Sequence, residues 1–318
     1  MLEGMGAKQG KPRFSLRPGA VVPGRLSPRV AWFVRWLVSP FARLMYRPVV
    51  RGHEHLPAKG AFLLVANHSG AAAIAEITSF IAWYTREVGV HRPLAGFAHP
   101  FAFRLPLLAT MMRGLGCVPS TYESALATLA QGVPLLVFPG GDHEATRPVW
   151  QANRVDFAGR KGFLRIAREA GVPIVPMGIR GAHYTVPIVW RSVWLLPRLL
   201  VVPWLFMGLK RYPVTLLAVL GAIGLSLCTA LGPWRFALAA AWFASPLALL
   251  PVVPASISMQ IGNPIAPDAL FPDGSDAALE TAYARVEADV QQLVRTAGRR
   301  RGASLGNAPH EGSSVTPP

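Results

Sequence analysis

Acidic residues and cysteines are scarce in this chain of 318 residues. It contains 16 Asp and Glu against 32 Lys and Arg, a formal net charge of +16, and it has two cysteines. Cys117 and Cys228 lie in apolar surroundings without metal-ligand spacing, so neither a disulfide framework nor a zinc site is predicted. Charged residues make up only 15% of the chain and hydrophobic residues 52%. That balance is the opposite of a disordered protein's.

The excess of basic residues is combined with a high apolar content. The mean hydropathy is +0.34. A soluble nucleic-acid-binding protein is expected to be less apolar than this, so no nucleic-acid partner is predicted. A basic and apolar chain suits the surface of an anionic bilayer, where each Lys or Arg near the headgroups contributes roughly 1 kcal/mol. The predicted partners are therefore membrane lipids and an anionic bilayer surface.

The charges are unevenly distributed. Residues 1–60 carry eleven Lys and Arg but only two acidic residues, and no acidic residue occurs between Glu169 and Asp268. A solvated surface normally mixes both signs, so the acid-free stretch is predicted to touch lipid. The first 30 residues contain no apolar run of the kind that a secretory signal needs. The predicted location is the cytoplasmic face of a membrane.

The N-terminal region divides into two parts. Residues 1–28 are rich in Gly, Pro and basic residues and are predicted to form a disordered tail. In residues 29–48, arginines alternate with aromatic and aliphatic side chains, and Pro40 interrupts the segment. This pattern predicts a pair of amphipathic helices that dock on the membrane. The alternative is an ordinary amphipathic helix packed on the domain.

Short apolar runs alternate with helical segments in residues 49–301, the predicted main domain. Residues 61–66, 134–138 and 173–177 are bounded by Gly or Pro and read as buried strands. Residues 122–131 between them have a helical composition. The predicted fold class is therefore α/β, with a largely parallel sheet flanked by helices.

The C-terminal part of this domain continues the helical pattern. Residues 162–170 are predicted as a helix that ends at Gly171. Residues 276–295 carry an apolar stripe and are predicted as the closing helix, with Ser275 as its N-cap. Residues 302–318 are predicted to be a disordered tail.

Two uncharged runs separated by Arg235 break the α/β pattern. Residues 212–234 and 236–254 are each long enough to cross about 30 Å of hydrocarbon, and residues 232–235 between them fit a turn. The prediction is an inserted hydrophobic helical hairpin at 212–254. It either spans the bilayer or lies in the interface, and the prolines of its second half favour the interface.

Polar residues follow the first predicted strand, and in a parallel sheet sites form at the carboxyl ends of strands. Asn67 and His68 come directly after that strand, and Glu76 lies two helical turns further on. A carboxylate fixes the tautomer of an imidazole and stabilises its cation, which a general base for an alcohol requires. The alternative is a hydrogen-bonded structural histidine.

A Gly-Gly pair follows the second strand, in the sequence Pro139, Gly140, Gly141 and Asp142. Glycine lets the backbone approach a ligand closely and aim its N–H groups at an anion or oxyanion. The alternative is a simple tight turn. The spacing fits neither a Walker loop nor the histidine pair of a zinc protease.

A third polar group stands at the start of a predicted helix. Ser120, Thr121 and Tyr122 follow a short strand-like segment and could face a substrate. The alternative is that they only cap the helix that follows them.

Four of these segments together have the order and spacing of the motif blocks of the glycerolipid acyltransferase superfamily. They are residues 67–68, 116–121, 136–141 and 171–176. The chain resembles the 1-acylglycerol-3-phosphate acyltransferase-like branch, and its Pro-Gly-Gly sequence is similar to the diacylglycerol-acyltransferase-like subset. The resemblance covers about residues 30–187 and resumes at residues 262–265.

This resemblance implies a membrane-bound enzyme that moves a fatty acyl group from acyl-CoA or acyl carrier protein to a lipid hydroxyl. It implies no metal and no cofactor other than acyl-CoA as co-substrate. His68 would be the general base, with Glu76 as its acid because the usual aspartate position is Ala73. The implied substrate-binding residues are Asn67, Ser120, Thr121, Tyr122, Pro139, Gly140, Gly141 and Asp142.

Two other functions compete with this prediction. Ala73 in place of the usual aspartate is compatible with a catalytically inactive family member that serves as a lipid-binding membrane scaffold. Ser69 beside His68 raises the possibility of a serine esterase, but the chain lacks a Gly-x-Ser-x-Gly elbow around it.

Overall fold

The computed structural model of the chain describes residues 23–69, 74–89, 91–193, 211–273 and 275–298. Residues 1–22 and 299–318, which include most of the first predicted tail and all of the second, lie outside this set. Residues 23–27, predicted as part of the tail, instead pack on the domain. Gly24 N donates to Gly116 O at 2.9 Å and Ser27 N to Gly114 O at 2.8 Å. The tail boundary at residue 28 was therefore set too late.

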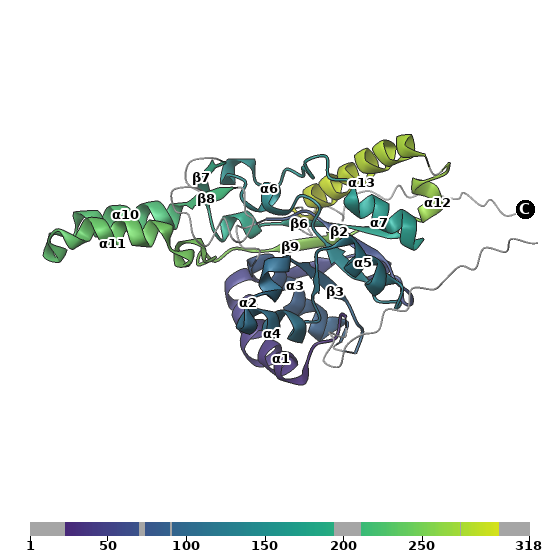
Figure 1. Cartoon of the computed structure of the whole chain (residues 1–318), viewed down its shortest axis with the longest axis horizontal. Coiled ribbons are helices and arrows are strands. Elements are labelled where there is room, and N and C mark those ends of the chain that lie inside the picture. The colour runs from purple at the N-terminus through teal and green to yellow at the C-terminus, as the bar shows by residue number, and fades with distance from the viewer. Residues whose placement is uncertain (1–22, 70–73, 90, 194–210, 274, 299–318) are drawn as a thin grey trace, which may run out of the picture.

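A seven-stranded sheet forms the centre of the molecule, in the order β1-β9-β6-β2-β5-β3-β4 (Figure 1). Every neighbouring pair is parallel except β6 and β9. The predicted α/β class with a largely parallel sheet is confirmed, and the three predicted strands are β2, β5 and β6. The strands are β1 (Val49–Arg51), β2 (Leu63–Ala66), β3 (Ala95–Ala98), β4 (Val118–Pro119), β5 (Leu135–Val137), β6 (Ile174–Arg180) and β9 (Ser258–Ile261).

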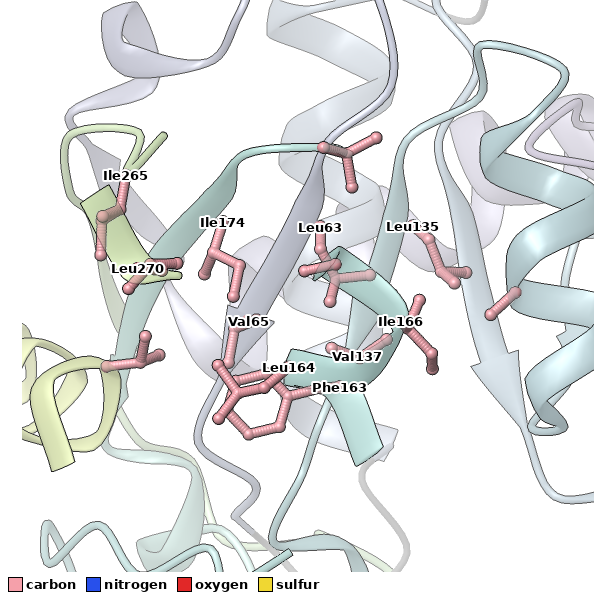
Figure 2. Close-up of a cluster of buried hydrophobic side chains, with 14 of the residues drawn as sticks. Leu63, Val65, Leu135, Val137, Phe163, Leu164, Ile166, Ile174, Ile265 and Leu270 are labelled. Atoms are coloured by element: carbon pink, nitrogen blue, oxygen red, sulfur yellow. The ribbon is translucent and has the colours of Figure 1, made fainter. Parts of the chain in front are cut away.

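Side chains that alternate along the strands build a hydrophobic core on each face of the sheet. In β2, Leu63 and Val65 point to one face, and Leu64 and Ala66 to the other. Figure 2 shows the first core, in which Leu63 and Val65 meet Leu164 of a covering helix. The first face is covered by α5 (Tyr122–Leu129), α7 (Gly162–Ala170) and α13 (Asp276–Ala297), and the second by α2 (Ser39–Tyr46) and α3 (Ile74–Glu87).

Helix ends follow the predictions closely. Ala278 N donates to the Ser275 side chain at 3.2 Å, so Ser275 is the N-cap of α13. Gly171 ends α7 in the left-handed conformation, with φ of +62°. Gly178 lets α13 lie directly on β6, because a Cβ there would be 2.4 Å from Val294 N.

The remaining short elements connect these layers. They are α4 (Pro106–Gly114), α6 (Gly141–Ala145), α12 (Pro267–Leu270) and the 3₁₀ turns η2 (His53–His55), η3 (Pro100–Phe103), η4 (Val149–Gln151) and η5 (Ala182–Tyr184).

The N-terminal segment is one helical stretch rather than the predicted pair. It consists of α1 (Pro28–Phe33), the π-helical turn η1 (Val34–Val38) and α2, and the residues at the two junctions keep helical dihedral angles. Pro40 lies in the first turn of α2 and has no backbone N–H to donate. The π-helical turn immediately before it accommodates the missing hydrogen bond. The outward face exposes Trp32, Trp36 and Leu44, while Ala42 and Tyr46 are buried.

The predicted hairpin is shorter than residues 212–254. Its first four residues form β8 (Tyr212–Thr215), which pairs antiparallel with β7 (Ile188–Ser192) in a ribbon. Two helices follow, α10 (Leu216–Leu227) and α11 (Trp234–Ala244), joined by η6 (Thr229–Leu231) and followed by η7 (Pro246–Leu249). We call α10 and α11 the arm, because they lie side by side and project away from the sheet (Figure 1).

The arm helices are short. They have 12 and 11 residues, so the longer one is about 18 Å long. Across the described parts of the chain, no helix combines the length and the apolar character needed to cross a membrane.

Candidate active site

His68 lies just beyond the carboxyl end of β2, in the middle of the sheet. The residue before it, Asn67, is buried and forms two hydrogen bonds with the backbone of Ile179 in β6. Its Nδ2 donates to Ile179 O at 2.9 Å, and its Oδ1 accepts from Ile179 N at 2.7 Å. The Asn67 amide therefore clamps β2 to β6 and does not face a substrate, contrary to its predicted role.

The imidazole of His68 is bonded to a buried carboxylate, as the sequence predicted. His68 Nδ1 is hydrogen-bonded to Glu76 Oε1 in the first turn of α3. The other oxygen, Glu76 Oε2, accepts from Ser69 N at 2.9 Å and from Ser69 Oγ at 2.6 Å. With Nδ1 committed to Glu76, Nε2 is the ring nitrogen that can take a proton from a substrate.

The surroundings of His68 make its imidazole a stronger base. Burial by itself would lower its pKa, but the Glu76 carboxylate, helped by Glu144 and Asp142, raises the pKa above the ordinary value of 6.5. The ring also stacks on Phe138, with centroids 4.6 Å apart and planes at 22°. The imidazole is thus fixed in position by a carboxylate on one edge and an aromatic ring on one face.

Glu144 is a second buried carboxylate in contact with His68, and it was absent from the predicted site residues. Its Oε2 accepts from His68 N at 2.9 Å and its Oε1 from Asp156 N at 2.9 Å. Burial raises its pKa to about 7, against the two backbone donors and Arg147, whose guanidinium lies 4.0 Å away. Glu144 therefore ties the backbone of His68 to the loop at residues 154–157.

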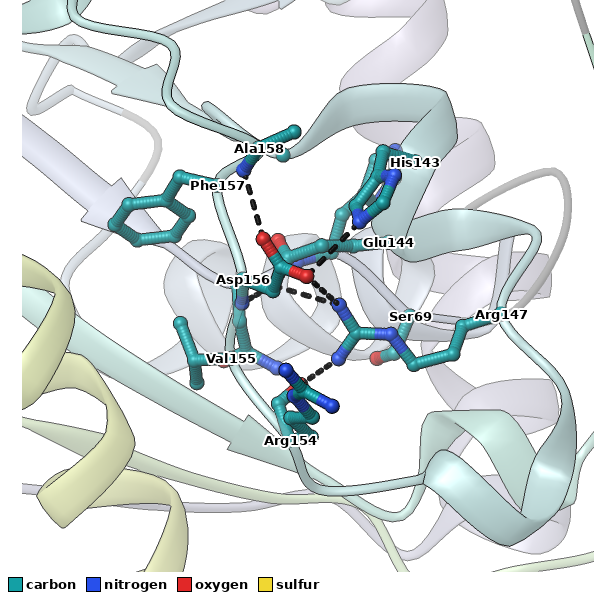
Figure 3. Close-up of polar contacts among 12 residues, drawn as sticks. Ser69, His143, Glu144, Arg147, Arg154, Val155, Asp156, Phe157 and Ala158 are labelled. Carbon is teal, nitrogen blue, oxygen red and sulfur yellow. Dashed lines mark hydrogen bonds and ion pairs between the residues drawn. The ribbon is translucent and has the colours of Figure 1, made fainter.

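The loop on the other side of Glu144 is held by a polar network. In Figure 3, Asp156 points toward both His143 and Arg147. His143 Nε2 lies 3.0 Å from Asp156 Oδ2, and Asp156 Oδ1 accepts from Ala158 N at 3.0 Å. His143 therefore contacts this loop, and the network holds in place the loop whose Asp156 N donates to Glu144.

The contacts of the Gly-Gly pair match the tight-turn alternative. Gly141 N donates to Phe138 O at 3.1 Å, so this N–H group closes a turn and is not aimed at an oxyanion. A Cβ at Gly140 would lie 2.2 Å from Glu144 Oε2, and one at Gly141 would lie 2.7 Å from Arg160 Nη1. The glycines make room for these two side chains.

Asp142 is bound by two arginines. Its Oδ1 accepts from Arg160 Nη2 at 2.8 Å and its Oδ2 from Arg211 Nη1 at 2.7 Å. Burial would raise the pKa of this carboxyl, but the two guanidinium groups hold it below its ordinary value. Arg160 also donates to Gly140 O at 2.9 Å and to Pro139 O at 3.3 Å, so Pro139 contributes its carbonyl to the same cluster.

The three residues after β4 lie apart from His68. Strand β4 is three positions from β2 in the sheet, a separation of about 14 Å at ~4.8 Å per strand. Thr121 is the N-cap of α5, with Ser124 N donating to its Oγ1 at 3.2 Å. Tyr122 OH donates to Glu169 in α7 at 2.7 Å, and Ser120 is exposed. These contacts match the capping alternative.

An apolar cavity of about 90 Å³ adjoins the histidine. Phe138, which stacks on His68, is also part of the cavity wall. Burial in this wall raises the pKa of Cys117 to about 11, so the thiol is un-ionised. The other wall residues include Phe80, Tyr84, Phe97 and Leu136. Within the described residues, no cluster of three or more His, Cys, Asp and Glu side chains is arranged to hold a metal ion.

Sequence reasoning found His68, Glu76 and Asp142 but missed several residues around them. Glu144, Arg160 and Phe138 lie inside the motif blocks or between them, so the residues were visible and only their roles were not. Arg191 and Arg211 lie beyond those blocks, on the ribbon. Only the tertiary structure brings them to the site.

Part of the chain is similar to known proteins. Residues 47–180 match the family described as Acyltransferase. An uncharacterized protein of Mycobacterium tuberculosis is 32% identical over 193 residues, which is 60% of this chain and 51% of the relative. The chain thus spans about half the length of that relative.

Two further proteins with known names are similar. The chloroplastic phytyl ester synthase 2 of Arabidopsis thaliana is 30% identical over 140 residues, covering 42% of this chain and 19% of the plant protein. The crystal structure of the 1-acyl-sn-glycerophosphate acyltransferase PlsC of Thermotoga maritima aligns with a TM-score of 0.46 at 19% identity, over 83% of this chain and 81% of that one.

Proposed function

We propose that this chain transfers a fatty acyl group from a thioester donor to a lipid hydroxyl, in keeping with the match of residues 47–180 to the Acyltransferase family. The observation that carries the proposal is the bond between His68 and the buried Glu76. It is the arrangement that a general base for a hydroxyl requires. The donor is acyl-CoA or acyl carrier protein, and the reaction contributes to lipid synthesis.

In the proposed reaction, His68 Nε2 takes the proton of the acceptor hydroxyl while that oxygen attacks the thioester carbonyl carbon. Glu76 stabilises the imidazolium that forms. The tetrahedral intermediate then collapses, the C–S bond breaks, and the proton on His68 passes to the leaving thiolate. No covalent acyl-enzyme is required.

The other two hypotheses fit the contacts less well. An inactive scaffold has no need for a buried carboxylate that is hydrogen-bonded to the histidine. Glu76 supplies the carboxylate that is absent at position 73, where this chain has alanine. For a serine esterase, Ser69 Oγ should donate to His68, but it donates to Glu76 at 2.6 Å. Both observations favour the acyltransferase.

We also propose that the enzyme is membrane-bound at the cytoplasmic face. The helical stretch of residues 28–46 exposes Trp32 and Trp36 beside arginines, and the arm exposes Leu227 and Trp234. Tyr46 OH donates to Pro251 O at 2.9 Å, so the base of the arm lies next to the end of α2. Apolar side chains and basic residues on adjoining segments suit an anionic bilayer surface.

The test is acyl transfer by the full chain from labelled acyl-CoA, or labelled acyl carrier protein, to a panel of lysophospholipids and glycerides. We expect His68→Ala to lower kcat by about 10²–10⁴-fold in protein that remains folded. His53→Ala, at an exposed histidine, is the matched control and should retain full activity. Equal turnover by wild type and His68→Ala would contradict the mechanism.

A further inference from the structure

The ribbon places two arginines beside α6, although it lies outside the part of the chain that matches the family. Arg211, immediately before β8, donates to Asp142 Oδ2 at 2.7 Å. Arg191, in β7, donates through Nη1 to the backbone carbonyl of His143 at 2.9 Å. The ribbon thus contacts two successive residues of α6, the short helix that begins three residues after Phe138.

Arg160 approaches the same carboxylate from the other side. It binds Asp142 Oδ1, while Arg211 binds Oδ2. Within the residues that the structure describes, Asp142 is the one carboxylate within 4 Å of any of these three arginines. Three positive charges against one negative charge leave a net charge of +2 at this point.

The arginines keep donors and accessibility for a ligand. The side chains of Arg160 and Arg211 are 43% and 23% exposed. Arg191 and Arg211 each use one nitrogen, Nη1, in hydrogen bonds to described residues. A guanidinium carries five N–H donors in a planar fork that fits phosphate oxygens.

Asp142 is two residues before Glu144, whose carboxylate accepts a hydrogen bond from His68 N at 2.9 Å. A phosphate bound to these arginines would therefore lie at the edge of the reaction centre. From these contacts we infer that Arg160, Arg191 and Arg211 form a phosphate-binding site, and that the ribbon residues Arg191 and Arg211 select a phosphate-bearing substrate. This inference rests on the proposed function, because it concerns a substrate of the same site.

Asp142 acts in this site as an internal substitute for the ligand. In the unliganded protein it neutralises part of the arginine charge and orients two guanidinium groups. An entering phosphate then shares or displaces those hydrogen bonds. The phosphate belongs either to the donor's nucleotide or carrier, or to the headgroup of the acceptor.

The experiment measures binding of two soluble probes to the full chain by calorimetry. Adenosine 3′,5′-bisphosphate represents the donor and glycerol 3-phosphate represents the acceptor headgroup. We expect one of them to bind, with affinity lowered roughly 10-fold or more in Arg191→Gln and in Arg211→Gln. Arg86→Gln, at an arginine that is 61% exposed at the far end of α3, should bind like wild type.

Two further variants keep the test decisive if a glutamine variant fails to fold. Arg211→Lys keeps the charge and should retain more affinity than Arg211→Gln. Asp142→Asn removes the internal competitor and should bind the probe more tightly than wild type. The probe that responds identifies the source of the phosphate.

The inference is overturned if wild type binds neither probe, or if folded Arg191→Gln and Arg211→Gln bind as wild type does. The arginines would then only fasten the ribbon to α6. Binding requires no turnover, so its failure is distinguishable from failure of the proposed function. Probe binding without acyl transfer would refute the function and leave the phosphate site standing.

Discussion

Two regions of the molecule differ in how fully their polar groups are hydrogen-bonded: the surroundings of His68, and the ribbon with its arm. Around His68, both oxygens of Glu76 and both of Glu144 are occupied by donors from this chain. On the ribbon, Arg191 and Arg211 reach the site with donors left over, and the arm exposes apolar side chains. A carboxylate whose oxygens all have partners fixes the local geometry. Spare donors and exposed apolar side chains are the groups that would make the proposed contacts with substrate and membrane.

The two regions also differ in their position in the sequence. The His68 region lies within residues 47–180, which match the Acyltransferase family, and the ribbon and arm lie outside them. We therefore expect substitutions around His68 to affect stability and catalytic rate. Substitutions in the arm should instead affect binding to the membrane. Five substitutions at four positions test this division, from the largest expected effect to the smallest.

Glu144→Ala should have the largest effect. It removes the acceptor for His68 N and Asp156 N and leaves Arg147, which is 2% exposed, without its buried partner. Loss of one partner of a buried pair costs about 3–5 kcal/mol. Chemical denaturation should show this loss, and Glu54→Ala, at an exposed carboxylate, should unfold like wild type. A loss below 1 kcal/mol would mean that Glu144 is dispensable.

Glu144→Gln tests the same residue through pH. Burial raises the pKa of Glu144 from 4.5 to about 7 in the folded protein. Folding therefore favours the protonated form of Glu144, and this preference stabilises the folded state. The stabilisation is fully present below pH 4.5 and is lost as the pH rises through 7. Glutamine does not titrate, so this part of the pH dependence of the free energy of unfolding should disappear. A pH dependence identical to that of wild type would contradict the assignment.

Glu76→Gln should lower kcat by about 10²-fold without a comparable loss of stability. Removing this carboxylate leaves burial as the main influence on His68, so its pKa should fall. The base is active when neutral, and the acidic limb of the pH–rate profile should therefore move to lower pH. Glu87→Gln at the other end of α3, 48% exposed, is the control. A limb that moved to higher pH would exclude Glu76 as the group that raises the pKa.

Gly140→Ala should be milder and should act through Glu144. The added Cβ would meet the Glu144 carboxylate at 2.2 Å, and overpacking of this kind costs about 1–3 kcal/mol. Gly162→Ala places a methyl group in open space at the start of α7 and should be neutral or slightly stabilising. Equal melting temperatures for the two variants would show that Glu144 can move aside.

Leu227→Ser in the arm should have the smallest effect on the enzyme itself. Leu227 is 74% exposed, so unfolding and turnover of detergent-dispersed substrate should be unchanged. Binding to anionic vesicles should weaken about 10-fold, because an apolar side chain that the bilayer buries contributes roughly 1.5–3 kcal/mol. Trp150→Ser, at a residue that is 66% exposed before α7, should bind vesicles like wild type. Unchanged vesicle binding by Leu227→Ser would remove this residue from the docking surface.

The parts of the fold that were predictable from sequence depend on local periodicity. The three apolar runs became β2, β5 and β6, and the bounds of α7 and the start of α13 matched because glycine and serine caps mark them. The ends of the tail and of the hairpin were misjudged for the opposite reason. Residues 23–27 and 212–215 form long-range backbone pairs that local composition does not encode.

The candidate site shows the same division. His68 and Glu76 were identifiable because a helix and a strand end place them within eight residues of each other. Asn67 and Gly141 were misassigned because their partners, Ile179 and Phe138, decide whether their polar groups face a ligand. The contributions of Arg191 and Arg211 depend on the folding of the ribbon against α6, which the sequence pattern could not reveal.

The one antiparallel pair in the sheet has a consequence for how this chain can vary. Strands β6 and β9 are neighbours, although the whole ribbon and arm lie between them in sequence. The insertion is therefore a loop whose two ends are held at adjacent positions in the sheet. The entropy of closing such a loop grows slowly, by about 0.6 kcal/mol for each doubling of its length. Homologous chains can therefore carry a longer arm or none, at little cost to the sheet that positions His68.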